Sequence, residues 1–457
     1  MSRTNDLTTG NVTKQLVSFT LPVLFGALFQ QFYSLVDTAI VGRTISVEAL
    51  AAVGATGSIT FLIIGFCNGM CSGFAIPIAQ RFGAKDERGL RRSFVNAIFL
   101  SVIMSILFTI VTVIFCMHIL RLMNTPEDII QMSYDYLVII FWGIPVTVFY
   151  NLFAGIIRAL GDSKTPLYFL IFSSVFNIGM DYLMIVGLHM GTAGAGVATV
   201  LSQFVAVILC GFVMWRNYPI LHMNKDEIGI NGDEIKILLG MGFPMGLQYS
   251  ITAIGSLLFQ TAVNGLGSLY VAAVTSASKI SLFCMQPFDA LGVAMATFAG
   301  QNLGARKPER IREGVRKALL IGAIYSIIAF LVLYFAGGTL ALIFVEGNNI
   351  ELIDLIATVL FWYSLFYVFL MILSVLRFSI QGMGYSFIAV LAGVMEMIAR
   401  GIMGVAVIPK YGFIAACLAS PLAWFGACVF LVPTYFVIIN KVKERLSSVS
   451  KRGLEIE

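Results

Sequence analysis

The chain has 457 residues, of which 59% are hydrophobic and only 12% are charged. Ordinary globular proteins have about 45–50% apolar and about 25% charged residues, so this composition excludes a water-soluble globular protein. Most of the chain is expected to lie in a bilayer. The net charge of +5 at pH 7 does not indicate nucleic-acid binding, because the placement of basic residues in membrane proteins follows topology.

Long apolar runs without strand-like alternation predict transmembrane helices and not a barrel. A span requires roughly 20 apolar residues. The N-terminal segment, Met1–Lys14, lacks a cleavable signal pattern, so the first run is expected to remain in the protein. About twelve runs are long enough, at roughly 15–41, 50–79, 94–117, 133–157, 166–188, 193–215, 236–263, 271–299, 318–345, 353–376, 386–408 and 413–440.

One pattern occurs twice, about 221 residues apart. Each copy has a proline early in an apolar run, Pro22 or Pro244, and ends in Gln-x-x-Gly-Ala followed by a basic residue, beginning at Gln80 or Gln301. Each copy holds six expected spans, an even number, so both copies have the same orientation. The repeat predicts two lobes related by an axis along the membrane normal.

Basic residues are distributed unevenly among the loops. The loops after even-numbered spans and the two tails hold 24 of the 29 Lys and Arg residues, while Lys279 and Arg400 fall within spans. The positive-inside rule therefore predicts that both termini are cytoplasmic. The expected division is an N-lobe at 1–215, a cytoplasmic linker at 216–235, a C-lobe at 236–440 and a cytoplasmic tail at 441–457.

Polar residues within the first six spans are candidates for function, because an ionisable group near the centre of a span costs roughly 2.5–3.5 kcal/mol. Gln30, Tyr33 and Asp37 have helical spacing and form one stripe. Asn177 and Asp181 are four residues apart and face the same way. Their oxygens suit a hard cation such as Na⁺, and two nearby carboxylates also suit a proton carrier. A purely structural cluster is the alternative.

The second half carries a different set of polar residues. Gln248, Gln260 and Asn264 fall on the seventh expected span, and Lys279 and Asp289 on the eighth. Glu396 and Arg400 are four residues apart and can pair with each other, which favours a structural role. Asp289 has no obvious local partner. The two lobes are therefore expected to do different work.

The stretch from Gln31 to Gly42 resembles the first helix of the multidrug and toxic compound extrusion (MATE) transporters. The two Gln-x-x-Gly-Ala endings resemble a repeated loop of that family, and Asn177-x-x-x-Asp181 is similar to the fifth helix of its prokaryotic branch of DNA-damage-inducible and staphylococcal exporters. The resemblance covers nearly the whole chain. It implies an all-α membrane fold of twelve helices, in two six-helix lobes around a V-shaped cleft, that exports drugs or metabolites in exchange for sodium or protons.

Carried over residue by residue, the resemblance assigns the coupling cation, Na⁺ or H⁺, to Asp37, Asn177, Asp181 and Thr199. Asn151 matches as well, although its position in the fourth span suggests a place nearer the cytoplasm. Pro22 matches a proline associated with bending of the first helix. Gln30 and Tyr33 match positions lining the substrate cleft, and Gln248 and Asp289 are added to that cleft from the polar residues of the second half.

The expected protein is thus a transporter in the cell membrane and not an enzyme. No cofactor is expected apart from the coupling ion. The expected partners are amphipathic, cationic small molecules and membrane lipids, with no nucleic acid, and the expected state is a monomer. Alternatives are a lipid-precursor flippase of the same superfamily, a major-facilitator-type antiporter, whose loop motif is only approximately echoed at Gly83–Arg92, and a membrane-embedded enzyme, which usually has paired acidic motifs.

Overall fold

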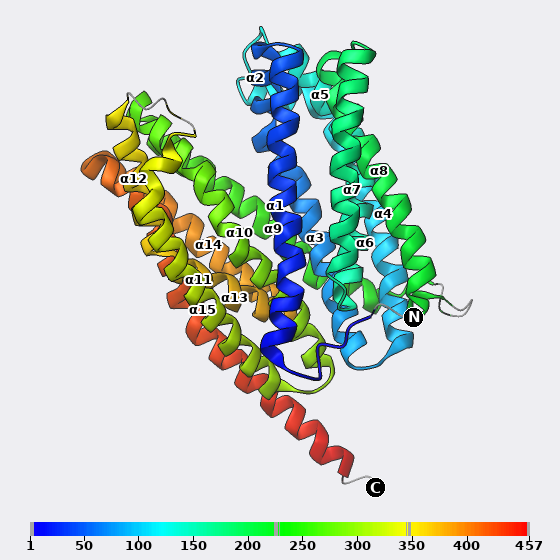
Figure 1. Cartoon of the computed structure of the whole chain (residues 1–457). Helices are drawn as coiled ribbons and strands as arrows, with labels where there is room; N and C mark the ends of the chain where they lie inside the picture. Colours follow the sequence, from blue (N-terminus) through cyan, green and yellow to red (C-terminus); the bar gives the residue numbers. More distant parts are fainter. Residues whose placement is uncertain (1–3, 224–226, 228, 344, 346–348, 455–457) are drawn as a thin grey trace. The chain divides into compact units, whose positions relative to one another are not determined.

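A computed structural model describes residues 4–223, 227, 229–343, 345 and 349–454, and every regular element within them is a helix (Figure 1). The first half contains α1 (Val12–Thr44), α2 (Val47–Ala55), α3 (Gly57–Gly83), α4 (Glu87–Leu122), α5 (Ile130–Trp142), α6 (Ile144–Ala159), α7 (Lys164–Asp181), the π-helix η1 (Tyr182–Gly187), α8 (Gly191–Asn217) and the 3₁₀ helix η2 (Pro219–Leu221). The second half contains α9 (Gly232–Asn264), α10 (Ser268–Gly304), α11 (Pro308–Ala341), α12 (Ile350–Leu365), α13 (Tyr367–Gly382), α14 (Ser386–Ile402), the π-helix η4 (Met403–Val407) and α15 (Ile408–Leu454).

The helices account for the twelve expected spans. Nine helical stretches of the described residues are long and apolar enough to cross a membrane, and the bent pairs α5–α6 and α12–α13 raise this to eleven. The last stretch, Ser386–Ser448, has 63 residues, which is about three times the length that one span needs. It is interrupted at Gly412 (φ 64°, ψ −142°), so it supplies two spans and makes twelve.

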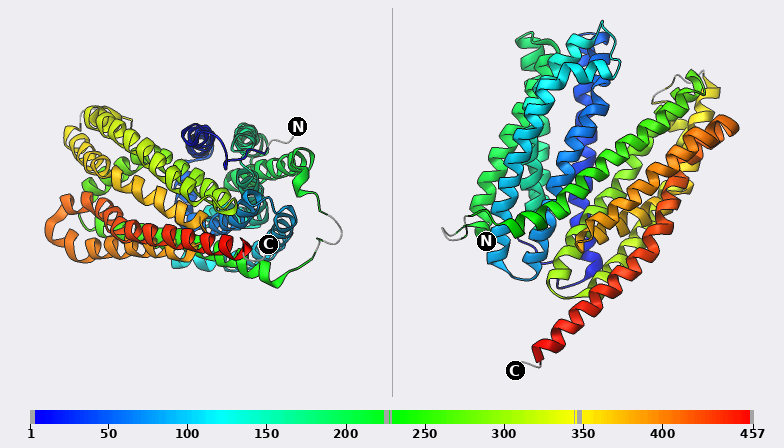
Figure 2. Two further views of the ribbon diagram at one scale, coloured as in Figure 1. Left: turned by 90° about the horizontal axis from the view of Figure 1, so that it is seen from below. Right: turned by 180° about the vertical axis from the view of Figure 1, so that it is seen from behind.

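The chain forms two compact units. Unit 1 comprises Met1–Asp6 and Phe25–Ser250, and unit 2 comprises Leu7–Leu24 and Ile251–Glu457. This differs from the lobes expected from the sequence, because the first half of α1 belongs to unit 2, while the linker and the first half of α9 belong to unit 1. The first helix of each repeat therefore starts in the unit that is formed mainly by helices of the other repeat. Figures 1 and 2 show each unit as a bundle of helices.

Unit 1 holds the first half of α9 by a glycine-lined helix crossing. A Cβ atom on Gly69 of α3 would lie 2.5 Å from the carbonyl oxygen of Met245, and one on Gly73 would collide with Gly242. On α9, a Cβ atom on Gly246 would lie 3.0 Å from Met70 and Phe66. Glycines four residues apart on both helices let the two backbones approach closely, which is a common way of packing helices where the solvent is lipid.

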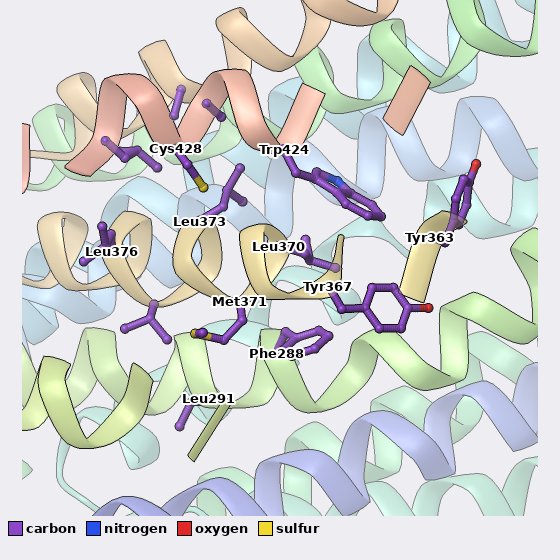
Figure 3. Packing of buried hydrophobic residues seen from close by; sticks show 14 of the residues in the cluster. Phe288, Leu291, Tyr363, Tyr367, Leu370, Met371, Leu373, Leu376, Trp424 and Cys428 are labelled. Atoms are coloured by element: carbon purple, nitrogen blue, oxygen red, sulfur yellow. The ribbon is translucent and has the colours of Figure 1, made fainter. Parts of the chain in front are cut away.

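Unit 2 is built around aromatic packing (Figure 3). Phe288 of α10 is 1% exposed, and its ring lies 5.2 Å from that of Tyr325 and 5.5 Å from that of Tyr367. Both contacts are edge-to-face, the geometry that the ring quadrupole favours. Tyr325 also donates its hydroxyl to the carbonyl oxygen of Cys284 at 2.8 Å. Pro287 disturbs the backbone bonding of α10 at this point, so Tyr325 stabilises the disturbed turn.

The two Gln-x-x-Gly-Ala loops each lie beside a chain segment that leads into a repeat. In unit 2, the N–H of Leu7 donates to Oε1 of Gln301 at 2.9 Å, and Asn302 Nδ2 donates to the carbonyl of Leu7. Arg310 and Lys307 donate to the carbonyls of Leu7 and Thr8. The basic loop of this unit therefore holds the segment before α1 through its backbone carbonyl groups.

In unit 1, arginines at the end of α3 and the start of α4 hold the segment before α9 and the first turn of α9 through carboxylates. Arg91 binds both oxygens of the buried Glu227, at 2.7 and 2.9 Å, and Arg81 pairs with Glu234. Asn96 accepts the N–H of Asn231 at 3.0 Å. The repeated loop is therefore a docking point for the segment that opens α1 or α9.

Candidate functional site

All five residues expected to bind the coupling cation lie in unit 1, and four of them come from three of its helices, α1, α7 and α8. Asp37 lies on the second half of α1, Asn177 and Asp181 on the last turns of α7, and Thr199 on α8. α7 and α8 pack along each other (Figure 2). Asp181 has no exposed surface, while Asn177 is 1% and Asp37 8% exposed.

The two aspartates lie close enough to each other for their carboxyl groups to interact electrostatically. In the orientation of the Asn177 amide that satisfies both of its partners, its nitrogen donates to Asp181 Oδ2 at 2.9 Å and its oxygen accepts the backbone N–H of Thr199 at 3.2 Å. Asn177 thus connects the aspartate pair to α8. The same-face placement of Asn177 and Asp181, which their spacing predicts, brings both into one cluster.

Each aspartate also has one buried oxygen that accepts no hydrogen bond from the described residues, namely Oδ1 of Asp37 and Oδ1 of Asp181. An unsatisfied buried polar atom costs about 1–3 kcal/mol and calls for an explanation. A bound cation or a proton at this pair would provide one. The described residues contain no group of three or more His, Cys, Asp or Glu side chains able to hold a metal ion, so any ion here would also need the amide and hydroxyl oxygens.

Tyr33 belongs to the same cluster. Its hydroxyl lies 3.5 Å from Oγ1 of Thr199, and it is one helical turn before Asp37. Tyr136 of α5 is close enough to both aspartates to interact electrostatically, and its carbonyl packs on Gly196 of α8. Tyr136 is absent from the sequence-based candidates, because an aromatic residue in an apolar run carries no signal of its own.

The end of α7 has an unusual backbone. The π-helix η1 begins at Tyr182, directly after Asp181. A π-turn widens the helix locally and is frequent at functional sites. Unit 2 has a corresponding π-helix, η4, which begins at Met403 and follows Ile402. Ile398 and Ile402 occupy the places that Asn177 and Asp181 have in unit 1, so the cation cluster has no counterpart there.

Asn151 is not part of this cluster. It lies on α6, and its side chain donates to the carbonyl of Thr147 on the same helix at 2.8 Å. Thr147 in turn donates to Gln203 of α8 at 2.6 Å. The side-chain hydrogen bond of Asn151 is therefore made within α6 and not with the other four residues.

The residues expected to bind substrate are divided between the two units. Gln30, Tyr33 and Gln248 belong to unit 1 and Asp289 to unit 2. Gln30 and Asp289 are exposed, Tyr33 is half-buried and Gln248 is 7% exposed. Pro22 lies in the part of α1 that belongs to unit 2, and α1 runs through it as one helix.

A buried charge network lies in unit 2. Glu396 accepts from Arg377 Nη1 at 3.0 Å and from Arg400 Nη2 at 3.4 Å. All three residues are less than 10% exposed. The pairing of Glu396 with Arg400 is confirmed, and Arg377 joins it from α13. The expected tenth span ended at 376, whereas α13 continues to Gly382 and carries Arg377 within its length.

Comparison with known proteins agrees with this architecture. The MatE family model matches residues 22–183 and again residues 244–405, which are the two repeats. The probable multidrug resistance protein YoeA of Bacillus subtilis is 29% identical, over 78% of this chain and 79% of its own length. DNA damage-inducible protein F of Escherichia coli is 26% identical over 70% of each chain.

The fold also matches a solved structure. An outward-facing conformation of a multidrug resistance MATE family transporter superposes with a TM-score of 0.90 at 21% identity, covering 97% of this chain and 99% of the other. At that identity the match supports the fold alone. Because the family model covers most of the chain, in the same two repeats that the helices display, the chain belongs to the MatE family of membrane transporters and is a multi-pass membrane protein, not an enzyme.

Proposed function

We propose that the protein exports amphipathic organic cations by alternating access in exchange for a cation that enters at Asp37 and Asp181. The observation that supports this most directly is the closeness of the two buried carboxyl groups of Asp37 and Asp181. Two ionised carboxylates at one buried site repel each other, so such a pair favours holding one shared proton. This favours H⁺ as the coupling ion, with Asp37 and Asp181 gaining and losing one proton per cycle.

Sodium is the second candidate, and a separate observation favours it. Oδ1 of Asp37 and Oδ1 of Asp181 accept no hydrogen bond from the described residues, and the Thr199 hydroxyl lies in the same cluster, 3.5 Å from that of Tyr33. The Asn177 amide oxygen would become a further ligand on rotation of the amide, which would turn its oxygen toward Asp181. Carboxylate, amide and hydroxyl oxygens are ligands of hard cations. In this case Na⁺ would displace the shared proton and bind between the same carboxyl groups.

The proposed direction of transport follows from the basic loops. Arg81 and Arg91 in unit 1, and Lys307 and Arg310 in unit 2, cluster after the second helix of each repeat. By the positive-inside rule we expect those loops and both termini to lie in the cytoplasm, and we propose that the protein acts as a monomer in the inner membrane. Export in this orientation means that substrate is taken from the cytoplasm and released outside.

Two residues, one in each unit and taken separately, support the proposed substrate class: Tyr33 in unit 1 and Asp289 in unit 2. An exposed carboxylate at Asp289 attracts a cation, and the ring of Tyr33 offers a face on which a cationic aromatic compound can stack. Gln30 and Gln248 add amide groups for hydrogen bonding. Asp289→Asn should weaken binding of cationic substrates more than that of neutral ones, measured with purified protein. An equal effect on both classes would remove Asp289 from the substrate site.

The coupling ion is tested with purified protein in lipid vesicles, by imposing a proton gradient or a sodium gradient alone and following a fluorescent organic cation. Transport driven by the proton gradient in sodium-free buffer supports the shared-proton proposal. Transport that needs sodium at every pH identifies the second candidate. Absence of cation transport under both gradients, with movement of a labelled lipid precursor instead, would identify a flippase and overturn the proposal.

A further inference from the structure

Unit 2 contains an apolar cavity of about 140 Å³ between the first half of α1, α10 and α11. α1 contributes Val17, Thr20 and Leu21, and all of the lining belongs to unit 2. Thr20 lies eight residues after Val12, the first residue of α1, which is about 12 Å along the helix. The three helices are all apolar enough to span a membrane, so the cavity lies at the depth of the lipid hydrocarbon.

Comparison of the two repeats shows that the first half of α1 and the first half of α9 pack differently against their neighbouring helices. Gly242 and Gly246 stand two residues before and after Pro244 and let α9 approach α3 closely. Thr20 and Leu24 stand at the same places around Pro22, and both line the cavity. The first half of α9 is therefore packed backbone to backbone, whereas the first half of α1 is held across a gap.

The lining leaves no polar group for a polar ligand. The hydroxyl of Tyr325 already donates to the carbonyl of Cys284 at 2.8 Å. The hydroxyl of Thr20 has no hydrogen-bond partner among the described residues, but it is fully buried and presents no surface to a ligand in the cavity. The other lining residues are apolar, including Phe288 and Leu291 of α10. A charged or hydrogen-bonding ligand would lose its hydration without compensation.

Size excludes a drug-like occupant. Pockets for drug-sized ligands measure about 300–1,000 Å³, whereas this one measures about 140 Å³. An apolar cavity of about 150 Å³ accepts a molecule such as benzene or xenon. Beside the cavity, the exposed side chains are aliphatic, with Val17 37%, Leu21 44% and Ile324 52% exposed. In a bilayer these side chains contact hydrocarbon, so an acyl chain can reach the cavity without crossing a polar surface.

We propose that this cavity is a binding site for hydrocarbon, occupied in the membrane by the terminal methylene groups of a lipid acyl chain. The bound chain fills the gap between α1 and α10 and stabilises the position of the first half of α1, because a ligand stabilises the conformation that binds it. The other half of α1 carries Asp37. The proposal concerns unit 2 alone and does not depend on the coupling ion.

The test is photo-crosslinking of the full-length protein in vesicles, with phospholipids that carry a diazirine either at the end of the acyl chain or next to the headgroup. Labelled peptides are identified by mass spectrometry. The chain-end probe should label the peptides that contain Thr20, Phe288 and Ile321, and the headgroup-proximal probe should not. Stronger labelling by the headgroup-proximal probe, or no labelling of these peptides, overturns the proposal.

Cavity-filling variants sharpen this test. Thr20→Leu adds volume inside the cavity and should abolish the labelling, while Thr20→Val removes the hydroxyl at nearly the same volume and should retain it. Ile321→Phe fills the space from α11 and serves if Thr20→Leu does not fold. Labelling that persists in a folded, filled variant overturns the site. If neither filled variant folds, the contrast between the two probes in the wild-type protein decides.

Discussion

The backbone N–H of Leu7 donates a hydrogen bond of 2.9 Å to Oε1 of Gln301, 294 residues further along the chain. Both residues are at most 1% exposed. Gln301 is the first residue of one of the two Gln-x-x-Gly-Ala motifs, so this bond shows that the motif has a structural role. It fixes the segment before α1 to the last turn of α10.

Gln301→Ala should destabilise the protein by about 1–3 kcal/mol, because a buried N–H would lose its acceptor. The measurement is thermal unfolding of the purified protein in detergent, where the variant should unfold at a lower temperature. Gln131→Ala is the control, since Gln131 is exposed and bonds only to Asp135. If the two variants unfold at the same temperature, the Leu7 bond contributes nothing to stability.

Gly69→Ala should weaken the crossing of α3 and α9. The new Cβ atom would lie 2.5 Å from the carbonyl oxygen of Met245 and 2.8 Å from the Tyr249 ring, and such overpacking typically costs about 1–3 kcal/mol. Gly54→Ala on α2 is the matched control, because its Cβ atom would meet nothing within 4 Å. Thermal unfolding should separate the variants, and equal stability would contradict the backbone-to-backbone crossing.

Asp37→Asn and Asp181→Asn should each insert and purify normally and lose gradient-driven efflux, because neither variant can exchange a proton through the pair. Efflux is measured in vesicles with an imposed gradient. Asp354→Asn, at an exposed position of α12, is the control and should transport normally. Wild-type efflux by either site variant would show that the pair is not the coupling site, whereas loss of folded protein would indicate a structural cluster.

Pro22→Ala should slow export and leave substrate affinity largely unchanged. Proline lacks the N–H that would bond to the preceding turn, so α1 can bend at Pro22 at low cost, and alanine would restore that bond. Single-turnover export and equilibrium binding separate rate from affinity. Pro433→Ala, at an exposed position of α15, controls for the general effect of replacing a helical proline. A normal export rate would restrict Pro22 to a packing role.

Glu396→Gln should destabilise unit 2 strongly, because Arg377 and Arg400 would lose their shared counter-charge. Breaking a buried ion pair from one side costs about 3–5 kcal/mol. Thermal unfolding measures the loss, with Glu351→Gln at an exposed position of α12 as the control. A variant that keeps wild-type stability but fails to transport would give the network a functional role and contradict the structural one.

The sequence by itself determined the fold class and the cation-site candidates on α7. Apolar runs of about 20 residues without strand-like alternation form helices in lipid, where every backbone polar group must be hydrogen-bonded within the segment. The patterns at Pro22 and Gln80 recur at Pro244 and Gln301, which specifies two related halves. Asn177 and Asp181 share a face because helix geometry is local. These conclusions depend only on residues close together in the sequence and on the lipid solvent, so the amino-acid sequence alone was sufficient to reach them.

Only the tertiary structure decided which distant residues meet. It brought Asp37 to Asp181, separated Asn151 from them, and added Arg377 to the pair of Glu396 and Arg400. It also placed the first half of α1 in unit 2 and left a cavity beside Thr20. The physical reason is that packing depends on side chains of helices that are hundreds of residues apart in the sequence. The periodicity within one helix does not determine which of its residues meet those of a distant helix.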